Sequence, residues 1–259
     1  MRYTGGGKRV RGLLIALSIY SRIPVPQIKW RDKDMKYSLC FFPFVGVIIA
    51  AALAGWQELS SYLGFGNIFR TLVITVIPII ITGGFHVDGY MDTMDAFHSY
   101  RSKEEKLKIL SDPHIGAFSV IMTIAYFSLF AAAVSEITTT EYMLLAGAGF
   151  VISRVISAFM VIYLKPAKGD GMLKYFSDTA GKVAVSTVLI LILAAVNIVG
   201  VIMVSWFILP ETAAALLFAF YYKYKCYKEF GGVTGDTAGF YVTVTELLIC
   251  IAVVIYKYI

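Results

Sequence analysis

Three aspartates stand at helical spacing in the first half of the chain. Asp88, Asp92 and Asp95 occupy positions i, i+4 and i+7, which places their side chains on one face of a helix. Like charges at this spacing destabilise a surface helix unless something cationic neutralises them. Divalent Mg²⁺ prefers oxygen ligands and is usually held by carboxylates together with substrate phosphates. The spacing therefore predicts a Mg²⁺ site with phosphotransfer chemistry.

The alternative for the same three carboxylates is a solvated acidic helix face, neutralised by lysines and arginines nearby. Their position argues against it, because they begin a few residues after an apolar segment that ends in Gly83 and Gly84. Ionisable groups beside a membrane span are costly and usually functional. The metal site is therefore the favoured interpretation.

A glycine-rich run near the C-terminus is the second candidate element. Residues 231–237 read GGVTGDT. Glycines let the backbone approach a ligand closely, and successive N–H groups can bind an anion. A helix that starts after such a run also offers its N-terminus to a phosphate. The run therefore predicts a phosphate-binding loop, although many such runs are only turns.

Other polar residues accompany the aspartates. Asp112 precedes Pro113 at the end of a short predicted helix, and it either returns to the metal face or caps the next helix. His86 is expected to hydrogen-bond a phosphate or an aspartate, because the histidines here lack zinc-ligand spacing with cysteines. Arg101 is expected to hold phosphates. Arg154 lies inside an apolar segment and is expected to snorkel or to pair with an aspartate.

Long apolar segments must position these residues. Only 15% of the 259 residues are charged, whereas a soluble domain carries about a quarter. A bilayer-spanning helix needs about 20 apolar residues, and the segments nearest to this length are 38–56, 68–82, 115–134, 142–164, 183–209, 211–224 and 240–258. We predict an all-α, polytopic integral membrane bundle of about seven transmembrane helices with short interfacial or cytoplasmic helices. It forms a single membrane-embedded catalytic domain, 1–259.

The distribution of basic residues gives the orientation. Some connections each carry at least three Lys or Arg residues: 22–36, 101–108, 165–182 and 223–228. The others carry none: 57–67, 135–141 and 210–212. The positive-inside rule then predicts a multi-pass protein with its N-terminus and polar loops in the cytoplasm and its C-terminus outside. The net charge of +6 reflects this topology and anionic lipids, so no nucleic-acid partner is expected. Residues 12–20 are too short to span comfortably, and we expect an interfacial or re-entrant helix there.

The chain resembles the cobalamin synthase family over nearly its whole length. The most specific block is 83–89 (GGFHVDG) with Asp92 and Asp95, which matches the pattern GG-x-H-x-DG-x-x-D-x-x-D. Other blocks follow in the family's order: 22–26 (RIPVP), 42–46 (FPFVG), 153–154 (SR) and 231–236 (GGVTGD), with Gly239 and Glu246. The chain departs from the family at Ala96, at 113–114 and at Thr243, where glycine, Ser-Arg and glutamate are common.

This resemblance implies a transferase of a prokaryotic plasma membrane that acts late in cobalamin biosynthesis. It would join adenosylcobinamide-GDP to α-ribazole, or to its 5′-phosphate, and release GMP. The resemblance implies Mg²⁺ as cofactor, bound by Asp88, Asp92 and Asp95, with one of these or Asp112 as the catalytic proton acceptor. It places the remaining candidates at the substrates: His86, Gly89, Arg101, Arg154, Gly231, Gly232, Thr234, Gly235 and Asp236.

Two other functions stay open. A CDP-alcohol phosphotransferase of phospholipid synthesis also carries aspartates at helical spacing, but its DG-x-x-A-R pattern is not met, since Asp88-Gly89 is followed by Asp92-Thr93. A membrane transporter would spread acidic residues through several spans or show inverted repeats. The expected partners are the two substrates and the lipid bilayer, and a homo-oligomer is compatible with the sequence.

Overall fold

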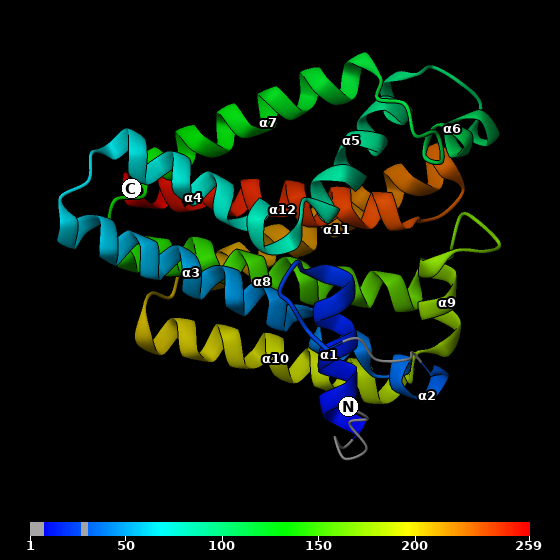
Figure 1. Cartoon of the computed structure of the whole chain (residues 1–259), viewed down its shortest axis with the longest axis horizontal. Coiled ribbons are helices and arrows are strands. Elements are labelled where there is room, and N and C mark those ends of the chain that lie inside the picture. The colour runs from blue at the N-terminus through cyan, green and yellow to red at the C-terminus, as the bar shows by residue number, and fades with distance from the viewer. Residues whose placement is uncertain (1–7, 27–30) are drawn as a thin grey trace.

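The computed structural model describes residues 8–26 and 31–259. Within these ranges the fold is helical, and long helices lie side by side in one bundle (Figure 1). They are α3 (Phe42–Leu63), α4 (Asn67–Thr82), α7 (Ala117–Glu136), α8 (Thr140–Tyr163), α10 (Lys182–Met203), α11 (Ile208–Phe230) and α12 (Gly235–Lys257). The short ones are α1 (Lys8–Tyr20), α2 (Asp32–Met35), η1 (Ser38–Phe41), α5 (Phe85–His98), α6 (Lys103–Ile109) and α9 (Met172–Thr179). The predicted all-α fold is confirmed.

Five described helices are long and apolar enough to cross a membrane: α3 together with η1, α7, α8, α10 and α12. The pair α4 and α5 forms a sixth candidate, bent by 95°. The prediction of about seven spans also counted α11. Glu211 and Lys223 bracket its apolar run, which leaves too few uncharged residues for a full crossing. The helical membrane bundle is confirmed, with five or six candidate spans.

Helix α8 forms the centre of the bundle. Nearly all of its side chains are buried, and α3, α10, α11 and α12 pack around it. Helices α7 and α10, in contrast, keep most of their apolar side chains exposed. Apolar side chains on the outside of a helical bundle suit a hydrocarbon environment, where burial is not needed to remove them from water.

The chain turns sharply between α4 and α5. Gly83 and Gly84 both adopt left-handed backbone conformations, with φ of +68° and +78°, which residues with a Cβ rarely adopt. After this turn α5 runs across the bundle instead of along it (Figure 1). The helix that carries the three aspartates is therefore aimed at α12.

Two glycines let α5 and α12 come into backbone contact. A Cβ atom on Gly89 would lie 2.7 Å from the carbonyl oxygen of Asp236, and one on Gly239 would lie 3.0 Å from that of His86. Such approaches leave no room for larger side chains. The crossing brings the aspartate helix against the first turns of α12, which follow the glycine-rich run.

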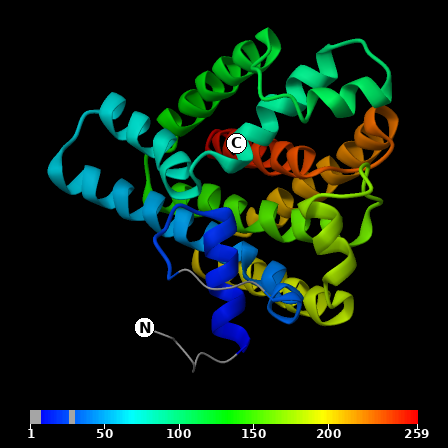
Figure 2. The ribbon, with the colours of Figure 1, turned by 45° about the vertical axis from the view of Figure 1, so that its right-hand side comes forward.

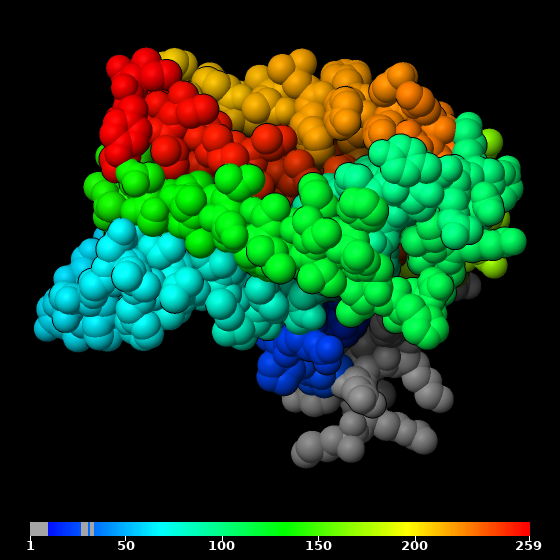
Figure 3. Space-filling model, turned by 90° about the horizontal axis from the view of Figure 1, so that it is seen from above, coloured from blue at the N-terminus to red at the C-terminus, as the bar shows by residue number. Residues whose placement is uncertain are grey.

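The connections separate into two groups by their charge. Figure 2 shows α5, α6 and the turn before α12 at one side of the bundle and the uncharged α3–α4 turn at the opposite side. The basic connections before α6, before α9 and at the end of α11 share the first side. All polar connections that carry candidate residues thus meet at one end. In the space-filling view α7 and α12 lie next to each other across the bundle (Figure 3).

Candidate active site

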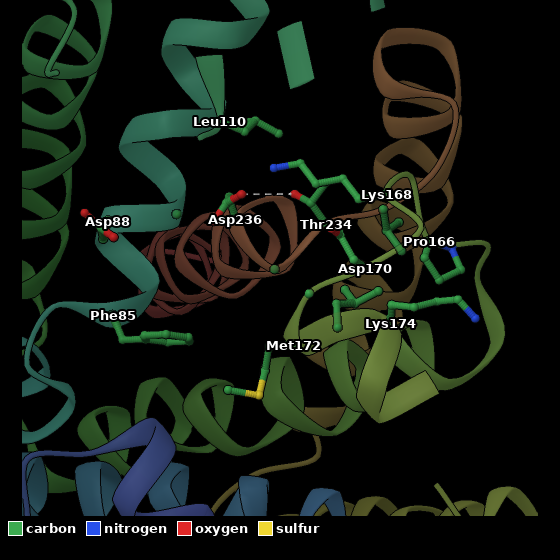
Figure 4. Close-up of a pocket in the computed structure, with 15 residues that line it drawn as sticks. Phe85, Asp88, Leu110, Pro166, Lys168, Asp170, Met172, Lys174, Thr234 and Asp236 are labelled. Carbon is green, nitrogen blue, oxygen red and sulfur yellow. Dashed lines mark hydrogen bonds between the residues drawn. The ribbon is translucent and has the colours of Figure 1, made fainter. Parts of the chain in front are cut away.

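A polar cavity of about 320 Å³ opens between α5, the first turn of α12 and the segment that leads into α9. Asp88 lies on one side of it and Asp236 next to Thr234, with Lys168 reaching toward Asp236 (Figure 4). We call this the polar cavity. Its other lining residues are Phe85, Gly89, Leu110, Pro166, Asp170, Gly171, Met172, Leu173, Lys174, Val233 and Gly235.

Aspartates at this cavity and beside it interact with one another and with Lys168. The charge of Asp92 interacts with those of Asp88, Asp236 and Asp95, and with the opposite charge of Lys168. Asp236 also interacts with Lys168. Three of these aspartates come from α5 and the fourth comes from α12. The α5–α12 crossing therefore adds an acid that the helical spacing alone does not predict.

Lys168 was not among the predicted site residues. Its ammonium group donates to the hydroxyl of Ser111 at 2.6 Å, and its charge faces Asp92 and Asp236. The sequence signal for it was the basic stretch after α8, which we attributed only to topology. The close approach of two segments that are far apart in the chain places this lysine at the acids.

Asp95 has a structural role that the spacing did not predict. Its Oδ2 accepts a hydrogen bond from the backbone N–H of Gly116 at 2.7 Å, and its Oδ1 accepts one from Ser119 at 2.9 Å. These donors belong to the N-terminus of α7, so the carboxylate caps that helix. Each carboxylate oxygen keeps a second lone pair, so the metal-binding role of Asp95 stays a prediction.

The described part of the chain contains no group of three His, Cys, Asp or Glu side chains arranged to hold a metal ion. The predicted three-carboxylate site is therefore not formed by the protein alone. Asp88 and Asp236 do share one cavity, and Asp92 stands beside them. Two carboxylates are the usual protein contribution to a Mg²⁺ site, where substrate phosphates and water supply the remaining oxygens.

Asp112 and Arg101 lie in a separate hollow of about 510 Å³. Asp112 accepts a hydrogen bond from the backbone N–H of His114 at 3.0 Å, and the His114 ring lies 2.6 Å away. These hydrogen bonds lower the pKa of Asp112. Arg101 is largely exposed and pairs with Glu105 at 3.6 Å. The structure therefore does not bring Asp112 or Arg101 to the polar cavity, so it does not support their predicted catalytic and substrate-binding roles.

Arg154 is buried inside the bundle, away from the polar cavity. Its Nη1 donates to Glu246 Oε1 at 2.6 Å and to the Phe150 carbonyl oxygen at 2.8 Å. Only 1% of the Arg154 side chain is exposed, so it does not snorkel, and its role at a substrate stays a prediction. Its partner is a glutamate of α12, and the predicted pairing with an aspartate was wrong.

The glycine-rich run is mainly a joint between two segments. Gly231 ends α11, and a Cβ on Gly232 would overlap the Lys165 carbonyl group. Here Val233 donates to Lys165 at 2.9 Å and accepts from Ala167 at 2.8 Å. This pairing fixes the segment that carries Lys168.

Most N–H groups of this run already have partners inside the protein. Gly231 donates to Tyr227, Val233 to Lys165 and Thr234 to the Thr237 hydroxyl. Thr234 and Thr237 form a capping box at the start of α12. The predicted phosphate-binding loop is therefore limited to the N-terminus of α12, where Gly235 and Asp236 line the polar cavity.

His86 points away from the polar cavity, toward an apolar one behind it. Only 6% of this residue is exposed, and it lies among aromatic rings of α1 and α3. The structure thus divides the predicted residues. Asp88, Gly89, Thr234, Gly235 and Asp236 share one cavity, whereas the others serve elsewhere.

Comparison with known proteins places the chain in a family. Residues 12–254 match the cobalamin-5-phosphate synthase family. The adenosylcobinamide-GDP ribazoletransferase of Lachnoclostridium phytofermentans is 40% identical over 249 residues, which cover 96% of this chain and 95% of the relative. Proteins of the same name are 35% identical in Clostridium botulinum (92% and 94% covered) and 31% identical in a Geobacillus species (91% and 92%). No solved structure shows a significant match.

These matches span the elements that build the site, from α1 to α12, in one continuous alignment. The resemblance to the cobalamin synthase family is therefore confirmed. The chain belongs to the cobalamin-5-phosphate synthase family.

Proposed function

We propose that this chain joins adenosylcobinamide-GDP to α-ribazole, or to its 5′-phosphate, and releases GMP. Its relatives carry the name of this activity. The observation that carries the proposal is the pairing of Asp88 from α5 with Asp236 from α12 around one cavity that also holds Lys168. A polar cavity with acids and a cation suits a substrate whose reacting centre is a diphosphate.

The residues fit the Mg²⁺ that the family resemblance implies. Asp88 and Asp236 would hold the ion, with Asp92 beside them, and the diphosphate would supply further oxygens. Bound Mg²⁺ would neutralise charge on the diphosphate and on the departing GMP. Asp95 caps α7 and lines the neighbouring hollow, so we do not include it in this set.

The chain's own groups account for the remaining requirements. Lys168 and the N-terminus of α12 attract the diphosphate, since both present positive charge to the polar cavity. A ribazole hydroxyl oxygen forms a bond to the phosphorus that carries the cobinamide, and the bond from that phosphorus to GMP breaks. The hydroxyl proton passes to a carboxylate of the cluster, Asp88, Asp92 or Asp236.

We further propose that this end of the bundle faces the cytoplasm. The basic connections 101–108, 165–182 and 223–228 lie at this end, and the positive-inside rule applies to such short loops. Nucleotide-activated substrates would then reach the polar cavity directly from the cytoplasm.

Membranes that contain the expressed chain test the proposal. With adenosylcobinamide-GDP, α-ribazole and Mg²⁺, the native chain should form product and GMP. Asp88→Asn and Asp236→Asn should each lower the rate at least about 100-fold, the scale seen when a group that stabilises transition-state charge is removed. Glu104→Gln, an exposed acid on α6, serves as the control and should keep the native rate. Near-native turnover in either aspartate variant would contradict the assignment.

A further inference from the structure

A second, apolar cavity of about 140 Å³ adjoins the polar cavity. Aromatic and aliphatic side chains from six helices and η1 enclose most of it; we call it the aromatic cavity. Its lining residues are Ile19, Tyr20, Leu39, Phe42, Phe85, His86, Ser157, Val161, Met172, Leu173, Phe176, Gly235, Ala238 and Gly239.

His86 contributes an unpaired polar atom to this apolar surrounding. The residue is 6% exposed, and its Nδ1 has no hydrogen-bond partner among the described residues. The ring stands 5.5 Å from that of Phe42 and 6.5 Å from that of Tyr20, measured between centroids. Burying an unpaired polar group is unfavourable. The imidazole ring lines the cavity, so a ligand bound there can give this ring the hydrogen-bond partner that it lacks.

The two cavities share part of their walls. Phe85, Met172, Leu173 and Gly235 line both of them. A single ligand can therefore place an apolar ring in the aromatic cavity and reach the acids of the polar cavity with a polar substituent. A nucleoside has this shape, because its base and its sugar hydroxyls lie at opposite ends.

We infer that the aromatic cavity binds the base of the ribazole substrate, and that the His86 imidazole donates a hydrogen bond to the ring nitrogen that is not bonded to ribose. This inference rests on the proposed function. The base is a benzimidazole, which is flat and apolar and carries one nitrogen acceptor besides the nitrogen bonded to ribose. One buried donor among aromatic rings matches that chemistry.

The other substrate parts fit this cavity less well. Guanine carries several donors and acceptors, and the aromatic cavity would leave most of them unpaired. The corrin ring system is far larger than the cavity. An apolar cavity of about 150 Å³ accepts benzene, so a two-ring base needs somewhat more room. Met172, an exposed and unbranched side chain in the shared wall, would have to move to give that room.

Two measurements test the inference on the full-length chain in lipid nanodiscs. The first compares α-ribazole with the matching indole riboside, in which a CH group replaces the free ring nitrogen. The native chain should show a KM about 10- to 100-fold higher for the indole compound, the usual effect of one lost buried hydrogen bond. Equal KM values would overturn the inference.

The second measurement uses His86→Phe, which keeps an aromatic ring but removes the nitrogen. Its KM for α-ribazole should rise by about the same factor, its KM for adenosylcobinamide-GDP should stay within about twofold, and it should no longer distinguish the indole compound. His98→Phe on the same helix is the matched control, since His98 Nδ1 bonds the Met94 carbonyl of its own helix. An unchanged KM for α-ribazole in His86→Phe would overturn the inference.

A failure of the proposed function can be distinguished from a failure of this inference. If the native chain formed no product, direct binding of α-ribazole, followed by the fluorescence of its base, would test the cavity separately. A Kd at least about tenfold weaker in His86→Phe than in the native chain would support base binding. Equal Kd values, or no binding by the native chain, would overturn it.

Discussion

Arg154 and Glu246 form an ion pair between α8 and α12, with 2.6 Å between Nη1 and Oε1 and both side chains buried. The pair lies deeper in the bundle than the polar cavity and fastens the helix that carries Asp236 to the central helix α8. A buried pair of this kind contributes little net stability compared with apolar residues of the same size, but loss of one partner is costly.

Removal of either charge should therefore destabilise the fold. Arg154→Met or Glu246→Leu leaves one charge without its partner, and we expect a loss of about 3–5 kcal/mol. Thermal unfolding of the detergent-solubilised protein measures this as a lower melting temperature. The double variant should recover much of the loss, because it removes both charges. A double variant less stable than either single one would contradict this account.

The α5–α12 crossing should tolerate no side chain at Gly89. In Gly89→Ala the new Cβ meets backbone atoms of Asp236, which cannot rotate away as a side chain can. We expect at least about a tenfold loss of activity, since small displacements of reacting groups are costly. Gly55→Ala on α3 is the matched control, because nothing lies within 4 Å of its Cβ position. That variant should keep full activity.

Asp95 and Asp88 should differ in their effect on metal dependence. Asp95→Asn weakens the cap of α7 and should cost about 0.5–2 kcal/mol of stability, while the Mg²⁺ concentration for half-maximal rate stays the same. Asp88→Asn should raise that concentration or abolish the response to Mg²⁺. Rates measured over a Mg²⁺ titration distinguish the two. A shifted Mg²⁺ response in Asp95→Asn would restore the three-carboxylate site.

Lys168 should affect the phosphorylated substrate selectively. Lys168→Met removes the cation that faces Asp92 and Asp236, and we expect the KM for adenosylcobinamide-GDP to rise by about tenfold or more. Lys182→Met, at an exposed position at the start of α10, is the control and should change no kinetic constant. Equal effects of the two substitutions would show that only the general positive charge of this end matters.

Asp34 makes the attachment of α1 to α2 sensitive to pH. Burial would raise the pKa of Asp34, but hydrogen bonds and charges from Arg11 and Arg31 outweigh it and lower that pKa. The stabilisation is therefore complete above the unfolded value of about 4 and is lost as the pH falls through the lower folded value. Limited proteolysis of the N-terminal segment should be unchanged between pH 5 and 8 and faster in Asp34→Asn. Equal cleavage of both proteins would contradict the role of this ion pair.

Local patterns in the sequence predicted the helices but not the tertiary contacts between them. The helical spacing of Asp88, Asp92 and Asp95 was right, and so was the end of the apolar segment at Gly83 and Gly84. The role of Asp95 could not be predicted, because its hydrogen-bond donors lie more than 20 residues further along the chain.

The remaining site residues depend on tertiary contacts as well. Asp236 joins the acids only because Gly89 and Gly239 let two helices touch, and helical periodicity contains no information on such a crossing. Lys168 joins them through a backbone pairing between distant loops. The alternation of charged and uncharged connections predicted that the basic loops share one end. It could not distinguish a lysine that only sets the membrane orientation from one that, like Lys168, lies at the polar cavity.

The backbone pairing of residue 233 with residues 165 and 167 limits how this protein can change in length. A Cβ on Gly169 would meet no atom within 4 Å, but its neighbours Lys168 and Asp170 line the polar cavity, so a change in length there would move both side chains. One residue inserted between 231 and 234 would shift this backbone pairing by one residue. The same shift would move Lys168 and Asp236 away from their shared position. Length variation among relatives should therefore be absent just before α12.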